Sequence, residues 1–129
     1  DGSGNWLSMP VEGKLEVVKM IRAEFKAKGV LINNPPLYYV DQVNNVLYQS
    51  ISENKLSVIS DDTIRTIFQT IAVMEGDYDD GSGKSKIVQL RDFLGERALK
   101  DYKKHFPDKY QYLVDEDKKN GQTDRGTEK

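Results

Sequence analysis

The sequence predicts an all-α fold: an irregular bundle of four to five helices, with room for one minor two-stranded β pairing. Two observations support this fold class. Apolar residues recur at spacings of three and four along most of the chain, which is the period of an amphipathic helix. Proline and glycine stand where the helical patterns begin and end.

The first helix is predicted near residues 11–28. Pro10 suits the start of a helix, and Gly29 suits the left-handed residue just past its end. A short apolar run at residues 30–32 follows. The apolar positions of this first helix share one face and are Val11, Leu15, Val18, Ile21 and Phe25.

A second helix is predicted after the two consecutive prolines. Asn34 suits its N-cap and Pro35 its first turn. Residues 54–60 read as irregular or briefly extended, so a small strand pair between residues 30–32 and 56–59 remains open. The expected apolar face of the second helix comprises Tyr39, Val40, Val43, Leu47 and Ile51.

Residues 61–75 carry the clearest amphipathic stripe in the chain. Ser60 suits the N-cap of this third helix, and Asp61 and Asp62 favour the positive end of the helix dipole. The stripe predicts a helix with one face in the core, and its members are Ile64, Ile67, Phe68, Ile71 and Met74.

Residues 76–83 are a loop by composition, and a fourth helix follows them. Gly95 is expected to weaken or bend this helix. Pro107 interrupts the pattern, and residues 108–114 can supply one more short helix. The residues expected to point inward from the fourth helix are Ile87, Leu90, Leu94 and Leu99.

Residues 9–114 are predicted to form a single helical domain. Residues 1–8 read as a linker or as a remnant added to the native sequence, although Trp6 is an unusual residue for a linker. Residues 115–129 are polar, without apolar anchors, and are expected to be disordered. No stretch has the length of a membrane span or the pattern of a signal peptide, and there is no cysteine. We therefore expect a soluble, cytoplasmic protein.

Neither a catalytic nor a metal-binding constellation is recognisable. The lack of cysteine excludes thiol catalysis and Cys-ligated metals, and His105 is the only histidine. We read His105 as a residue that interacts with a helix C-terminus. The expectation is a non-enzymatic protein with no catalytic residues, metal ligands or cofactors.

The segment Gly81-Ser82-Gly83-Lys84-Ser85 resembles a phosphate-binding loop, and residues 71–94 resemble the start of a thymidylate-kinase-type enzyme. The departures are large. Tyr78 stands where the loop needs glycine, a helical stripe replaces the required strand, and only 46 residues follow Gly83. A degenerate phosphate-binding loop is therefore less favoured than binding to a protein partner or to nucleic acid.

The acidic segment Glu75-Gly76-Asp77, with Ile87-Val88 beginning a helix after a serine-containing turn, resembles a loop of the helical immunity proteins that neutralise nuclease colicins. The tyrosine pair that precedes the loop in that family lies far upstream here, at Tyr38 and Tyr39. The resemblance implies an acidic helical inhibitor.

Charge is separated along the chain. Residues 60–82 carry six acids and one base, whereas residues 84–109 carry eight bases and four acids. We therefore expect a helical binding module that acts through an unidentified protein partner, with a basic partner as one option. It would act as an inhibitor of the immunity type or as an adaptor. The alternative is nucleic-acid binding through the basic and aromatic residues of segment 97–110. The expected contact residues are Asp77, Tyr78, Asp79, Asp80, Lys100, Lys103, Lys104 and Tyr110.

Overall fold

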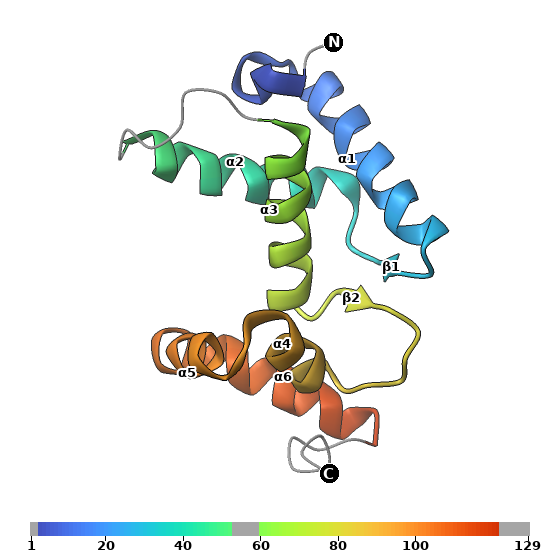
Figure 1. Ribbon diagram of the computed structural model, residues 1–129, viewed down its shortest axis with the longest axis vertical. Helices are drawn as coiled ribbons and strands as arrows, with labels where there is room; N and C mark the ends of the chain where they lie inside the picture. Colours follow the sequence, from blue (N-terminus) through green and yellow to red (C-terminus); the bar gives the residue numbers. More distant parts are fainter. Residues whose placement is uncertain (1–2, 53–59, 122–129) are drawn as a thin grey trace. The chain divides into compact units, whose positions relative to one another are not determined.

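The computed structural model describes residues 3–52 and 60–121 (Figure 1). In these residues the chain forms six α-helices, one 3₁₀ helix and two strands of two residues each. The predicted all-α fold class is confirmed. The chain divides into two compact units, Asp1–Ile71 and Ala72–Lys129, which are described separately below.

The first unit contains α1 (Val11–Ala27) and α2 (Pro36–Ser52). The bounds of α1 agree with the predicted helix, but α2 begins one residue later than expected. A residue that precedes proline is disfavoured in the helical conformation, so Pro36 keeps Pro35 outside the helix. The carbonyl of Pro35 instead accepts the first helical hydrogen bond, from the Tyr38 backbone N–H at 3.0 Å.

The first unit also contains the 3₁₀ helix η1 (Ser3–Ser8), which precedes α1, and the strand β1 (Leu31–Ile32), which lies between α1 and α2. Most of α3 (Asp61–Met74) completes it. The Ser60 hydroxyl accepts from the Thr63 backbone N–H at 3.2 Å, so Ser60 caps α3 as predicted. Whether residues 30–32 form a strand was left open by the sequence, and β1 shows that Leu31 and Ile32 do. Their suggested partner, residues 56–59, lies outside the described residues.

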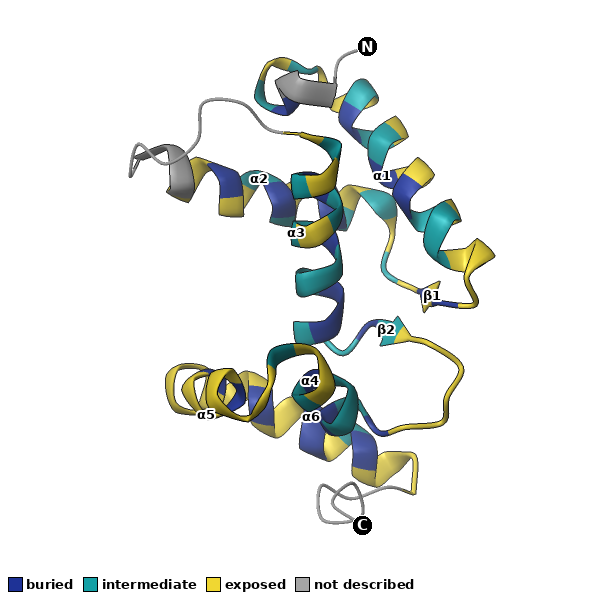
Figure 2. Cartoon of the chain, in the orientation of Figure 1, coloured by how far each residue is buried: buried dark blue, intermediate teal, exposed yellow. Residues whose placement is uncertain are grey.

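Phe68 joins the three long helices of the first unit. Its ring stacks on Tyr39 of α2 with centroids 4.3 Å apart, and on Phe25 of α1 with centroids 5.8 Å apart. Phe68 and Tyr39 are completely buried. Figure 2 shows buried and exposed residues alternating around these helices, as expected for helices with one face in a core. Most described members of the predicted apolar stripes therefore pack in this unit, whereas Val11 is 47% exposed.

Trp6 is completely buried, although residues 1–8 were expected to form a linker or remnant. Its indole Nε1 donates to Asn44 Oδ1 of α2 at 2.8 Å. The Lys14 ammonium donates to the same oxygen at 3.1 Å and lies 5.6 Å from the centre of the indole ring. Burial lowers the pKa of Lys14. A buried and hydrogen-bonded indole therefore attaches η1 to the first unit.

An ion pair connects α1 to α3. Arg65 donates Nε and Nη2 to the two carboxylate oxygens of Glu24, at 2.7 and 2.9 Å. This two-point geometry is the strongest form of an arginine–carboxylate pair. The hydrogen bond from Arg65 lowers the pKa of Glu24 below its ordinary value of 4.5. Ionised Glu24 therefore stabilises the folded state.

We expect Glu24→Gln to lower the free energy of unfolding at pH 7 by less than about 1 kcal/mol, because both side chains are partly exposed. The folded-state pKa of Glu24 lies below 4.5, so the stabilisation is present above pH 4.5 and is lost as pH falls through the lowered pKa. Urea unfolding at pH 7 and at pH 3 should show the difference between wild type and variant shrinking in acid. A difference of the same size at both pH values contradicts this. Glu16→Gln is the exposed control on the same helix.

The second unit contains the last turn of α3, β2 (Tyr78–Asp79), α4 (Lys86–Leu94), α5 (Glu96–His105) and α6 (Pro107–Lys119). Its buried core takes residues from all four helical segments. The members of this core are Val73, Ile87, Leu90, Leu99, Tyr102, Tyr110, Leu113 and Val114.

Gly95 ends α4, whereas it was expected only to weaken or bend one long helix. Its backbone adopts φ 86° and ψ 163°, which lies outside helical geometry and which residues with a Cβ rarely adopt. The predicted fourth helix is therefore two helices, α4 and α5. The last helix, α6, also runs to Lys119, five residues past the predicted end at residue 114.

The extension of α6 places a carboxylate in the core of the second unit. Asp117 is completely buried, and its two oxygens accept from the backbone N–H groups of Lys86 and Ile87, at 2.8 and 3.1 Å. The hydroxyl of Ser85 accepts from the next N–H, that of Val88, at 3.1 Å. These N–H groups are among the four that a helix leaves without an internal partner. Asp117 therefore fixes the start of α4 against α6.

We expect Asp117→Ala to lower the free energy of unfolding by about 2 kcal/mol, because two buried N–H groups lose their acceptor. Chemical denaturation followed by circular dichroism measures this change. The matched control is Asp115→Ala. Asp115 is an exposed acid on the same helix that accepts from Gln111 at 2.9 Å, and its removal should cost much less. Equal losses of unfolding free energy in the two variants would show that the buried cap stabilises the fold no more than an exposed hydrogen bond does.

Candidate functional site

The predicted contact residues of the acidic loop differ in exposure: Asp77 is buried, Tyr78 is partly buried, and Asp79 and Asp80 are exposed. Asp77 is only 8% exposed, and Tyr78 packs against the core of the second unit. Asp79 and Asp80 are exposed, and their Oδ1 atoms accept from the backbone N–H groups of Gly81 and Ser82, each at 3.0 Å. Hydrogen bonds from Ser82 lower the pKa of Asp80. Only Asp79 and Asp80 of this group therefore present a carboxylate at the surface.

The loop that carries these acids is fixed at its first residue. Gly76 has φ 76°, and a Cβ at this position would lie 2.5 Å from a methyl group of Leu113. The carbonyl of Gly76 accepts from the Lys86 ammonium at 2.6 Å. The glycine therefore allows the loop to leave α3 directly over α6, and Lys86 holds it there.

The same contacts bear on the phosphate-loop hypothesis. Residues 61–74 form α3, so the strand that such a loop requires is a helix here. The first N–H groups of α4, which a phosphate would have to contact, already donate to Asp117 and Ser85. The loop around Lys84 thus offers a phosphate neither a preceding strand nor the N–H groups of the following helix.

The predicted basic contact residues lie on one helix. Lys100, Lys103 and Lys104 are exposed on α5. The Lys103 ammonium lies 5.0 Å from the centre of the Tyr110 ring, which is a cation–π contact. Tyr110 itself is only 8% exposed and belongs to the core. The lysines are therefore accessible, whereas the tyrosine predicted to accompany them is not.

The opposite side of α5 borders a groove, which we call the Met74 groove. We give this name to two hollows, of about 410 and 300 Å³, that both include Met74 in their walls. The larger hollow is walled almost entirely by apolar atoms. The residues of the larger hollow are Met74, Leu94, Ala98, Asp101, Tyr102, His105 and Phe106; those of the smaller are Met74, Glu75, Asp108, Lys109 and Tyr112.

Two aromatic side chains line the Met74 groove while remaining exposed. Phe106 is 47% exposed and Tyr112 is 54% exposed. Exposed aromatic side chains beside apolar hollows are a typical feature of protein–protein interfaces. Phe106 belongs to the aromatic residues of segment 97–110, whereas Tyr112 was not among the predicted contact residues. The available signal was that Tyr112 falls off the buried face of its helix, which carries Tyr110, Leu113 and Asp117.

The charged residues of the Met74 groove are mostly acidic. Asp101 and Asp108 are exposed. The Glu75 carboxylate lies 3.0 Å from the Lys109 ammonium, so these two charges offset one another. His105, the histidine noted in the sequence, also lines the larger hollow. The groove therefore combines apolar walls with a negative rim.

Tyr102 fixes the wall of the groove between α3 and α5. Its hydroxyl donates to the Met74 carbonyl at 3.0 Å. Burial and the negative charge of Glu75 raise the pKa of Tyr102 to about 12. The hydroxyl therefore stays protonated at neutral pH and can keep this hydrogen bond.

Comparison with known proteins gives no assignment: no family model, curated protein sequence or solved structure matches the chain. In the described part of the chain, no group of three or more His, Asp or Glu side chains is arranged to hold a metal ion. None of the described helices is both long and apolar enough to cross a bilayer.

We expect Tyr102→Phe to lower the free energy of unfolding by about 1 kcal/mol at pH 7, the typical value of one hydrogen bond. The raised pKa of Tyr102 means that the protonated hydroxyl stabilises the fold below pH 10, the ordinary value, and that this contribution is lost as pH rises through about 12. Denaturation of the wild type and the variant at pH 7 should show this loss of unfolding free energy, and denaturation in strong alkali should show that the difference has disappeared. Tyr112→Phe, at an exposed position, is the control and should have little effect; an equal loss in both variants contradicts the assignment.

Proposed function

We propose that this protein is a non-enzymatic binding module that receives a basic, amphipathic segment of a partner protein in the Met74 groove. The observation that supports it best is the pair of exposed aromatic side chains, Phe106 and Tyr112, on the walls of two hollows that share Met74. Aromatic residues dominate the binding energy of many interfaces when a partner covers them.

The apolar walls favour a peptide segment as the ligand. Met74, Leu94 and Ala98 offer contact area but few hydrogen-bonding groups for a small polar molecule. An amphipathic helix places apolar residues at positions i, i+3, i+4 and i+7, which suits a groove with two hollows. One apolar anchor in each hollow would cover both exposed aromatic rings.

The charges favour a basic partner. Asp101 and Asp108 are exposed on the rim of the groove, and Asp79 and Asp80 add exposed carboxylates in the same unit. Opposite charges on two partners speed their encounter and determine their register. The exposed lysines of α5 project from the other side of that helix, because residues 100, 103 and 104 are not in phase with residues 98, 102 and 105. We therefore assign them no contact with the segment.

The alternative of nucleic-acid binding has less support. That function needs aromatic rings on which bases can stack, next to basic residues. In segment 97–110, Tyr102 and Tyr110 are 4% and 8% exposed, which leaves Phe106 as the exposed aromatic side chain of this segment. Phe106 lines the groove whose rim is acidic. A partner with phosphate groups would meet like charges there.

The proposal is tested by selecting peptides from a displayed random library against the full chain. We expect enrichment of sequences with apolar residues at helical spacing and with lysine or arginine between them. Binding of a selected peptide, measured by fluorescence anisotropy, should weaken about tenfold or more in the double variant Phe106→Ser and Tyr112→Ser. Phe93→Ser is the matched control, because Phe93 is 37% exposed but does not line the groove. Peptides that bind the double variant as well as the wild type contradict the proposal.

The electrostatic part is tested separately. Replacing Asp101 and Asp108 by asparagine should slow association of a selected peptide at low salt and leave its dissociation rate nearly unchanged. Asp115→Asn removes an exposed acid outside the groove and serves as the control. Association rates that are equal in all three proteins would show that the acidic rim does not guide the partner.

A further inference from the structure

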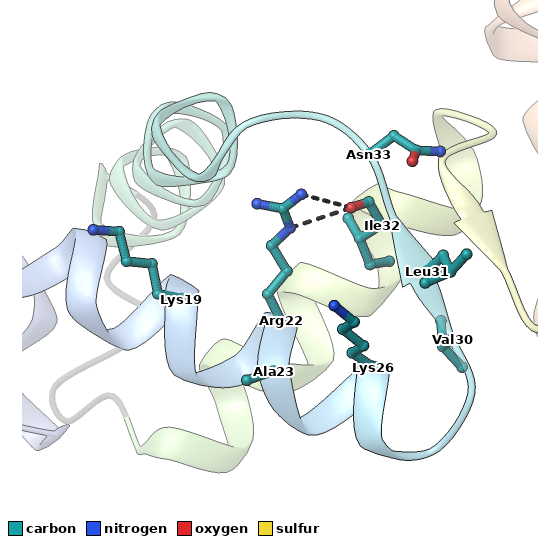
Figure 3. Close-up of a pocket in the computed structure, with 8 residues that line it drawn as sticks. All are labelled: Lys19, Arg22, Ala23, Lys26, Val30, Leu31, Ile32 and Asn33. Atoms are coloured by element: carbon teal, nitrogen blue, oxygen red, sulfur yellow. Dashed lines mark hydrogen bonds between the residues drawn. The ribbon is translucent and has the colours of Figure 1, made fainter.

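We infer that the first unit carries a second binding site, for a phosphate monoester with a small apolar body. The site is a hollow of about 400 Å³ between one face of α1 and residues 30–33. It involves residues of the first unit only, so it is independent of the Met74 groove. The residues that line it are Lys19, Arg22, Ala23, Lys26, Val30, Leu31, Ile32 and Asn33 (Figure 3).

Three basic side chains share this hollow. Lys19, Arg22 and Lys26 follow one another on α1 at spacings of three and four, which places them on one face of the helix. Figure 3 shows the Arg22 guanidinium between the side chains of Lys19 and Lys26. None of the residues that line the hollow is acidic. Like charges at this spacing repel one another, so a bound anion would offset an unfavourable interaction.

Arg22 is held in position for an anion before one binds. Its Nε and Nη2 groups donate to the Ile32 carbonyl at 3.2 and 2.8 Å. A guanidinium has five N–H donors in a rigid plane, so further donors remain after these two hydrogen bonds. An arginine fixed in this way loses less conformational entropy when it binds a phosphate oxygen.

The acids nearest in the sequence do not occupy the site. Glu24 is on the opposite side of α1, where its carboxylate is engaged by Arg65. Glu16 lies 3.7 Å from the Lys19 ammonium, but both side chains are more than half exposed, which makes this a weak pair. A phosphate with two negative charges would compete with Glu16 for Lys19.

The apolar residues that line the hollow indicate which kind of group the phosphate is attached to. Val30 and Ile32 are buried, and together with Ala23 and Leu31 they give one side of the hollow an apolar surface. Apolar surroundings lower the local dielectric constant and so strengthen the interaction between cations and a phosphate. The volume is at the lower end of the range of about 300–1,000 Å³ typical of small-molecule sites. A phosphate attached to a small apolar group therefore suits both parts of the site.

The test is isothermal titration calorimetry of the full chain with phenyl phosphate at fixed ionic strength. We expect saturable binding of one molecule per chain, and weaker binding of inorganic phosphate, which cannot use the apolar side of the hollow. Lys26→Gln should weaken the binding of phenyl phosphate by about tenfold, because one charge-assisted contact is lost. Lys28→Gln removes the same charge from the end of α1 outside the hollow, and should change the affinity by less than about twofold.

A third variant separates specific binding from charge alone. Arg22→Lys keeps the charge but loses the fixed planar donors, so it should also weaken binding, with folding checked by circular dichroism. If Lys26→Gln and Lys28→Gln weaken the binding of phenyl phosphate equally, the binding reflects general electrostatic attraction to a basic surface, and the inference is overturned. The absence of saturable binding, or equal affinities for phenyl phosphate and inorganic phosphate, would overturn it as well.

Discussion

The buried carboxylate of Asp117 is the interaction on which the second unit depends. It satisfies the N–H groups of Lys86 and Ile87 and thereby sets the start of α4 against α6. A buried charge is costly unless it is fully hydrogen bonded, so α4 can begin only where its N–H groups meet this carboxylate. Lys86, the first residue of α4, then reaches back to the Gly76 carbonyl. One interaction thus aligns two helices and the loop that connects α3 to them.

The Met74 groove follows from this arrangement. With α4 and α6 fixed, α5 is held between them by Leu99 and Tyr102, which are buried in the core. The hydrogen bond from Tyr102 to the Met74 carbonyl joins α5 to the end of α3. The apolar hollow lies beside this joint, and the junctions at both ends of α5, next to Gly95 and Pro107, border it through Leu94 and Phe106. Phe106, the residue between α5 and α6, is exposed at this junction.

The sequence contained enough information for the helices and for part of their ends. Periodic apolar residues identified α1 and α3, and Ser60 was found as a cap because its hydroxyl acts on a residue only three positions away. Gly95 and Asp117 were more difficult. Whether Gly95 bends a helix or ends it depends on its backbone angle ψ, which the sequence does not give. Asp117 accepts hydrogen bonds from residues that lie 30 and 31 positions earlier in the chain. A charge in a polar C-terminal segment carries no local sign that it will be buried.

The candidate sites show the same limit. Composition located the exposed carboxylates of Asp79 and Asp80 and the exposed lysines of α5, but it also chose Asp77 and Tyr110, which the fold buries. Burial of an acid or a tyrosine is decided by long-range packing, which a local pattern does not contain. The basic hollow of the first unit was visible in part, since Lys19, Arg22 and Lys26 form a stripe. Its other wall comes from residues 30–33, and the hydrogen bonds of Arg22 to Ile32 cannot be read from spacing.

The burial of Trp6 has a practical consequence for spectroscopy. It is the only tryptophan of the chain, and its indole is enclosed by η1, α1 and α2 in the first unit. Emission excited at the red edge of its absorption band therefore reports on the surroundings of that unit alone. The second unit has no tryptophan, and its core contains tyrosines such as Tyr102 and Tyr110. Tryptophan fluorescence can thus follow the melting of the first unit without any attached dye, for comparison with circular dichroism of the whole chain.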